Sequence, residues 1–250
     1  MFPDTVVQFF AQSQELLWLT VLLTDLAATV LLYRLFGKTG LQVAIATAII
    51  LANLQGPKLT IIFGIETTLG VIFYSGIFFA TDVLSENYGH AEAKKAVRMG
   101  FAVSVIVLVM LSFALMFQPS DQPETSAFSN DIHNAFATIL DFTPRFIAGS
   151  LLAYFISQSF DVWAFHQIRR FTGERWLWLR NNLSTMSSQI VDTAIFSLVA
   201  WWGVVDLITA LKLGAAKYVF KVTIAMIDTS FIYWARAMFR RHQVPVVQAG

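Results

Sequence analysis

Residues 67–84 read TTLGVIFYSGIFFATDVL, an apolar run in which Asp82 is the one charged side chain. A helix of about 20 apolar residues is long enough to cross the hydrocarbon core of a bilayer. A charge inside such a helix costs roughly 2.5 to 3.5 kcal/mol on the mildest insertion scale, so it is retained where a partner within the bundle or a ligand offsets that cost. This stretch therefore predicts a membrane-spanning helix with a polar group in its interior.

The composition of the whole chain agrees with this interpretation. Of the 250 residues, 56% are hydrophobic and 13% are charged, and the mean hydropathy is +0.63. In soluble domains about a quarter of the residues are charged. The 17 basic and 16 acidic residues nearly balance, which argues against a nucleic-acid partner, because phosphate binding needs a clustered excess of lysine and arginine.

The apolar runs predict an all-α, polytopic membrane bundle of about seven transmembrane helices in the lipid bilayer. The predicted spans are 16–36, 41–57, 67–84, 96–117, 145–165, 185–206 and 216–238. Lysine and arginine gather in alternate connections and at the C-terminal end, whereas the connection 118–144 has neither. Because these residues favour the cytoplasmic side, we expect the N-terminus outside and the C-terminus inside.

Polar side chains recur at helical spacing within these spans. Phe78, Asp82 and Glu86 are four residues apart and therefore share one face of the third span, as Gln158 and Asp161 do in the fifth. For Glu86 the alternative interpretation is a charged residue at the end of the span, at the membrane surface. Both patterns favour a polar face that is turned toward protein or water rather than lipid.

The last two spans continue this pattern. Gln189 and Asp192 lie on one face of the sixth span, which a hydrogen-bonded seam between helices would also explain. Lys221 and Asp228 are about two turns apart in the seventh span, too far to pair with one another. We therefore expect each to find a partner on another helix, and Lys221 to pair with an interior aspartate.

Several signatures of enzymes are missing from the chain. It has no cysteine, no GxxxxGK[ST] phosphate loop, no GxGxxG and no HExxH, and its histidines have no metal-ligand spacing. We therefore expect no catalytic activity, no cofactor and no bound metal.

Five short motifs occur in a fixed order: FATD at 79–82, ENYG at 86–89, FDV at 160–162, WLRNN at 178–182 and QIVDT at 189–193. In their order and spacing they resemble the queuosine-precursor transporter family, also called the vitamin-uptake-transporter family. The resemblance covers residues 41–238. Asn53 matches an asparagine of the family, and Lys221 lies in its lysine-bearing last span.

The resemblance implies a six-helix transporter core at 41–240, preceded by an N-terminal extension with an extra transmembrane helix at 1–40 and followed by a cytoplasmic tail at 241–250. It implies a multi-pass protein of the bacterial inner membrane that imports a 7-deazaguanine, such as 7-cyano- or 7-aminomethyl-7-deazaguanine. A homodimer is compatible with it. The alternatives are a related vitamin or nucleobase carrier, and a non-transporting membrane protein whose polar residues serve helix packing.

The side-chain chemistry fits such a substrate. The guanine-like edge presents N1–H and an amine as adjacent donors, which carboxylates accept, and a carbonyl, which an amide donor binds. Aromatic side chains such as Phe78, Phe160 and Trp163 would stack on the flat ring. The predicted substrate-binding residues are Asn53, Phe78, Asp82, Glu86, Gln158, Asp161, Asn182, Gln189, Asp192, Lys221 and Asp228.

Overall fold

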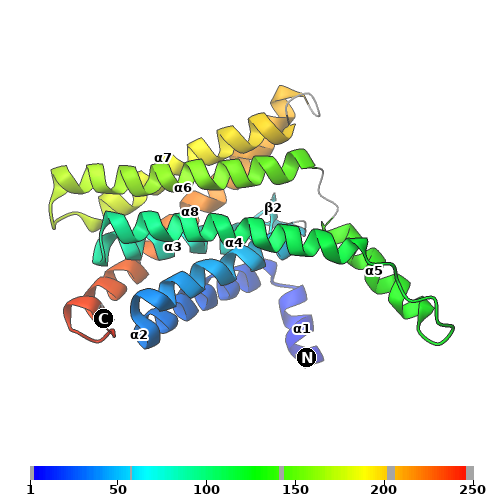
Figure 1. The fold of residues 1–250 in the computed structure, drawn as a ribbon. Helices are drawn as coiled ribbons and strands as arrows, with labels where there is room; N and C mark the ends of the chain where they lie inside the picture. The colour runs from blue at the N-terminus through cyan, green and yellow to red at the C-terminus, as the bar shows by residue number, and fades with distance from the viewer. Residues whose placement is uncertain (1–2, 57, 141–143, 202–205, 246–250) are drawn as a thin grey trace.

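The long helices of the chain run side by side, with α6 and α7 on one side of the bundle, α2 on the other and α3 and α4 between them (Figure 1). This computed structural model describes residues 3–56, 58–140, 144–201 and 206–245. The helices are α1 (Asp4–Ala11), α2 (Gln14–Gln55), α3 (Gly70–Asn87), α4 (His90–Met116), α5 (Ser126–Leu140), α6 (Pro144–Thr172), α7 (Leu177–Phe196) and α8 (Leu207–Arg240), with a π-helical segment, η1, at Ser197–Trp201. The predicted all-α architecture is therefore confirmed, apart from one short hairpin.

That hairpin pairs β1 (Leu59–Ile62) with β2 (Ile65–Thr68) in antiparallel register. It was not predicted, and it moves the start of the third helix from residue 67 to Gly70. The other predicted helices begin at or before the predicted starts of their spans. Helices α6 and α8 also extend past the predicted ends, because the polar turns at their C-terminal ends remain helical. Pro57, the predicted end of the second span, lies outside the described residues.

Helix α2 contains the predicted separation between the first two spans. Gly37 has φ +59° and ψ −136°, which is not helical, so α2 consists of two helical halves joined by a kink. Glycine is required here, because a Cβ at this position would lie 2.4 Å from the backbone oxygen of Pro245. A side chain would also be strained at this positive φ.

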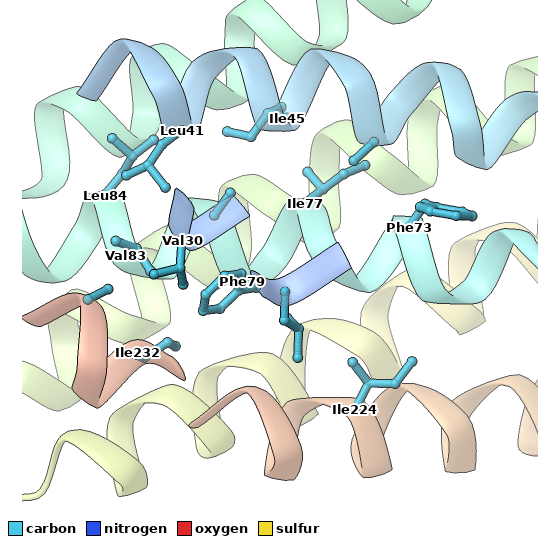
Figure 2. Close-up of a cluster of buried hydrophobic side chains, with 14 of the residues drawn as sticks. Val30, Leu41, Ile45, Phe73, Ile77, Phe79, Val83, Leu84, Ile224 and Ile232 are labelled. Atoms are coloured by element: carbon cyan, nitrogen blue, oxygen red, sulfur yellow. The ribbon is translucent and has the colours of Figure 1, made fainter. Parts of the chain in front are cut away.

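Helix α3 is central to the bundle and is buried along almost its whole length. Its apolar side chains pack against both halves of α2 and against α8; Figure 2 shows Phe79 and Val83 of α3 with Val30, Leu41 and Ile232. The first half of α2 is part of this core, since Trp18, Leu22 and Leu26 are buried in it. The division at residue 40 between an extension and a core stays a prediction.

The ENYG motif forms the turn from α3 to α4. Asn87 Nδ2 donates a hydrogen bond to the hydroxyl of Tyr33, at 2.9 Å, and the ring of Tyr88 packs edge-on against that of Tyr33. Gly89 precedes α4 with φ +85°, a conformation that glycine adopts without a steric cost. The motif therefore ties the α3–α4 turn to the first half of α2.

Helix α5 lies in the connection 118–144 and extends away from the bundle (Figure 1). Phe128, Ile132 and Phe136 are exposed at a spacing of four residues, so the helix has an apolar stripe rather than a continuous apolar run. Its 15 residues are too few to span a bilayer.

Within the described part of the chain, α2 and α4 are long and apolar enough to cross a membrane, with mean hydropathies of 1.9 and 2.5 over their most apolar windows. The other long helices that the sequence predicts to span carry the polar side chains described below. The count of seven spans stays a prediction.

Candidate functional site

A cavity of about 570 Å³ opens at the end of the bundle where α3 begins. The hairpin, α2, α3, α4, α6, α7 and α8 all contribute to its wall, and its volume is typical of small-molecule sites. The polar or aromatic side chains that line it include Asn53, Glu66, Tyr74, Tyr154, Asp192, Lys217 and Lys221. Asn53, Asp192 and Lys221 among the predicted site residues therefore meet here.

The cavity wall contains a buried ion pair. Lys221 Nζ lies 2.5 Å from Asp192 Oδ2, and the Tyr74 hydroxyl donates to Asp192 Oδ1 at 2.5 Å. Ser157 Oγ donates to the same oxygen at 3.2 Å, and the Lys221 ammonium lies 4.5 Å from the centroid of the Tyr74 ring. The predicted pairing of Lys221 with an interior aspartate is confirmed, and the added hydrogen bonds offset part of the desolvation cost of the two charges.

The next polar layer lies one helical turn deeper. Phe78 follows Tyr74 on the same face of α3, with the two ring centroids 5.7 Å apart. Gln158 Oε1 accepts a hydrogen bond from Thr81 Oγ1 at 3.1 Å. Gln158 Nε2 and Gln189 Oε1 are buried without a hydrogen-bond partner among the described residues.

Two carboxyl groups come together below this layer. Asp82 Oδ2 accepts from Thr185 Oγ1 at 3.2 Å, and Asp161 Oδ1 accepts from Ser188 Oγ at 2.9 Å. The two side chains interact directly with one another. Their other oxygens, Asp82 Oδ1 and Asp161 Oδ2, are buried and receive no hydrogen bond from any described residue.

Asp228 lies on α8 near these two carboxyl groups and interacts electrostatically with both. Asn181 Nδ2 donates to its Oδ1 at 3.2 Å. Asn182 points elsewhere, since its Nδ2 donates to the backbone oxygen of Trp178 and to Thr229 Oγ1, both at 2.8 Å. The structure therefore places Asn182 in the contact between α7 and α8, outside the cavity.

Glu86 lies at the opposite end of α3, about 18 Å along the helix from Tyr74. Arg180 Nη2 is 2.6 Å from its Oε2 and Arg236 Nε is 3.0 Å from its Oε1. Arg169 donates to the backbone oxygens of Ser85 and Glu86. Glu86 thus joins α3 to α6, α7 and α8 in a cluster, here called the arginine cluster.

Glu174 extends the arginine cluster toward the surface. It forms ion pairs with Arg169, Arg236 and Arg240 at 3.0, 2.7 and 2.6 Å. The hydrogen bond from Arg169 is the main reason that the pKa of Glu174 falls to about 2, from an ordinary value of 4.5. The end of the bundle opposite the cavity is therefore held together by charge.

The buried polar residues form one continuous column. Tyr74, Phe78, Asp82 and Glu86 recur every four residues along one face of α3. Residues of α6, α7 and α8 gather at the levels of Tyr74, Asp82 and Glu86. The sequence reasoning did not assign Tyr74, Tyr154 or Arg180 to the site. The spacing of four before Phe78 indicates Tyr74, whereas Tyr154 and Arg180 depend on contacts between helices.

Of the predicted stacking rings, Phe78 is in the column. Trp163 is 51% exposed, so the expectation that it faces the polar interior is wrong. It follows Asp161 by two residues, which turns it toward the opposite side of α6.

Comparisons with known proteins agree with this arrangement. The family model described as "Putative vitamin uptake transporter" matches residues 68–235, a range that contains most of the column. The "Probable queuosine precursor transporter" of Bacillus subtilis (strain 168) is 40% identical over 223 residues, which are 88% of this chain and 94% of the relative. The "Queuosine precursor transporter" of Escherichia coli (strain K12) is 28% identical over 172 residues, 66% of this chain and 71% of the relative.

No solved structure matches the chain. The family match and the B. subtilis relative each cover well over half of the chain. With its apolar helices and its buried polar column, the chain belongs to the vitamin uptake transporter family of membrane proteins.

Proposed function

We propose that the chain imports a queuosine precursor, a 7-deazaguanine such as the 7-cyano or 7-aminomethyl compound, across the bacterial inner membrane. The relatives from B. subtilis and E. coli carry the name of queuosine precursor transporter. The observation that supports the proposal is the cavity, whose wall contains Tyr74, Asp192 and Lys221, together with a neighbouring column in which buried carboxylate and amide atoms have no partner among the described residues. The function is transport, and no catalytic step is assigned.

The predicted orientation gives the path a direction. With seven spans and the N-terminus outside, the cavity and the hairpin face the exterior, whereas the arginine cluster faces the cytoplasm. The substrate enters the cavity past Asn53 and the ion pair of Lys221 and Asp192. The ion pairs of Glu86 must separate before the substrate leaves on the other side, which is an alternating-access cycle.

Recognition of the substrate follows from the unpartnered atoms of the column. Asp82 Oδ1 and Asp161 Oδ2 accept from N1–H and the exocyclic amine of the guanine-like edge, while Gln158 Nε2 donates to its carbonyl oxygen. Tyr74 and Phe78 offer aromatic faces for the flat ring, for which stacking contributes about 1 to 3 kcal/mol per base in comparable sites.

The remaining predicted residues shape this site. Gln189 presents a further acceptor, Oε1, and Asp192 holds Lys221 in the cavity wall. Asp228 keeps Asn181 in place. Glu86 and Asn182 act on the contacts between helices rather than on the substrate.

Uptake of radiolabelled 7-deazaguanine into membrane vesicles tests the proposal. Uptake above that of vesicles without the protein is expected, and 7-cyano-7-deazaguanine should compete for it. A matched competitor, 7-deazaadenine, presents its amine without an N1–H donor and should compete far less.

Three outcomes would change the assignment. Stronger competition by a vitamin or by guanine would indicate a related carrier on the same scaffold. Equal competition by the two deazapurines would contradict recognition by the carboxylates. No uptake by folded protein would favour a non-transporting membrane protein whose polar residues serve helix packing.

A further inference from the structure

The three carboxyl groups at the centre of the column have no counterion in the described part of the chain. The exposed fractions of Asp82, Asp161 and Asp228 are 1%, 0% and 3%. Ion pairs among the described residues involve the neighbouring carboxylates Glu86 and Asp192 but none of these three. Their donors are a threonine, a serine and an asparagine side chain. All three donors are neutral.

Charge balance in such a place requires protons. Burying one ionised carboxylate costs several kcal/mol even after relaxation, and two carboxylates that share a site cannot both ionise readily. The Asp82 and Asp161 side chains interact directly, yet neither Asp82 Oδ1 nor Asp161 Oδ2 receives a donor from the protein as described. A proton bound by one of the three carboxyl groups removes one of their negative charges and so lowers this repulsion.

Other charged groups near the column are already engaged or lie further away. On the cavity side, Lys221 is bound to Asp192 and Lys217 lies over the ring of Phe196. On the opposite side, Arg180, Arg236 and Arg169 hold Glu86. From α2, Asp25 approaches α3 so closely that a Cβ on Gly76 would lie 2.6 Å from its Oδ2.

We infer that Asp82, Asp161 and Asp228 bind a proton, and that this proton crosses the membrane together with the substrate, a coupling that rests on the proposed transport function. A neutral deazaguanine brings hydrogen-bond donors but no charge, so it cannot replace the proton as the neutralising group. Proton and neutral substrate therefore bind together. The proton enters through the cavity with the substrate and leaves with it on the cytoplasmic side, so the protein ends each cycle unchanged.

The test uses the full-length protein in liposomes with the membrane potential clamped and labelled 7-cyano-7-deazaguanine, which is neutral, as the probe. With the outside one pH unit more acidic, coupling to one proton predicts accumulation to roughly tenfold the external concentration, because 1.4 kcal/mol corresponds to a factor of ten. Substrate addition should also make a weakly buffered external medium more alkaline. Without a pH gradient, the internal concentration should only reach the external one.

Variants assign the proton to the carboxyl groups. Asp228→Asn, at the carboxyl group that is assigned no contact with the substrate, should lose accumulation driven by the pH gradient, measured per protein molecule. Asp25→Asn removes a carboxyl group that is also within a long apolar helix but outside the column, and it should respond to the gradient as the wild type does.

The wild-type measurement decides the matter even if a variant does not fold. Uptake that reaches the same level with and without the gradient would overturn proton coupling while leaving the transport function intact. Absence of any uptake would instead defeat the proposed function. Loss of the gradient response in Asp25→Asn, with the response retained in Asp228→Asn, would move the proton site to Asp25 and overturn this assignment.

Discussion

Arg180 and Glu86 form a buried ion pair at the end of the bundle opposite the cavity, with Arg180 Nη2 2.6 Å from Glu86 Oε2 and Arg180 Nε 3.0 Å from the same oxygen. Arg180 also donates to the backbone oxygens of Gly173 and Arg175, at 3.0 and 2.9 Å. The pair therefore fixes the turn between α6 and α7 against the end of α3. Since the cavity is open at the other end, this contact closes the column on the side proposed to be cytoplasmic.

Replacing Glu86 by Gln should lower the stability and membrane abundance of the protein markedly. The change leaves Arg180 buried without its counterion, and breaking a buried pair on one side costs about 3 to 5 kcal/mol. The matched control is Glu174→Gln, which removes an exposed carboxylate from the same arginine cluster and should cost about 0 to 1 kcal/mol. Thermal unfolding of the purified proteins measures both costs. Equal losses of stability in the two variants would contradict the distinction between a buried and an exposed ion pair.

The contribution of Glu174 should depend on pH. Its arginine partners hold the folded-state pKa at about 2, below the ordinary value of 4.5, so its stabilising effect is present above pH 4.5 and is lost as the pH falls toward 2. The small difference in melting temperature between wild type and Glu174→Gln should therefore shrink as the pH falls from 4.5 toward about 2. A difference that grows on acidification would contradict this assignment.

Lys221→Met and Asp192→Asn should each reduce folded protein in the membrane, because each leaves one buried charge unpaired, at about 3 to 5 kcal/mol. The double variant removes both charges and should be more abundant than either single variant. Lys212→Gln, at an exposed position of α8, is the control and should be unaffected. If the decrease in folded protein in the double variant equals the sum of the two single decreases, the two residues act independently and the pairing is contradicted.

Asp82→Asn and Asp161→Asn should impair transport while leaving abundance near normal. An amide donor then faces the donor edge of the substrate, and the loss of one charged hydrogen bond costs about 1.5 to 3 kcal/mol, or roughly ten- to a hundredfold in affinity. The measurement is uptake per molecule, with membrane abundance quantified in parallel. Reduced abundance with normal uptake per molecule would show that the two aspartates only hold helices together.

The sequence predicted the parts of the structure that depend on local pattern. Apolar run length located α2, α3, α4, α6, α7 and α8, although α7 ends at Phe196, before the predicted end of its span at residue 206. The break between residues 36 and 41 is the kink at Gly37. The pairing of Lys221 with an interior aspartate followed from the cost of an isolated charge in a membrane helix. Helical spacing also placed Phe78 and Asp82 on the face of α3 that meets the column.

Apart from the pairing of Lys221 with an aspartate, the features that depend on contacts between helices were not predicted. Glu86 continues the spacing of Asp82, but it is paired with Arg180 of α7 and Arg236 of α8. Because these arginines lie near the ends of their helices, the sequence did not predict that they would pair with a buried carboxylate. The hairpin is short and largely exposed, and α5 is amphipathic rather than uniformly apolar. Neither produces the long apolar run on which the prediction of spans relied.

The most direct test of the central claim uses bacterial cells that cannot synthesise the queuosine precursor and lack their own transporter. When these cells express the chain and are fed 7-cyano-7-deazaguanine, queuosine should appear in their transfer RNA, measured by mass spectrometry of the nucleosides. Cells with an empty vector should show none, and Asp161→Asn at equal abundance should restore far less. Transfer RNA that still lacks queuosine, although the wild-type protein is confirmed in the membrane, would contradict the transport assignment.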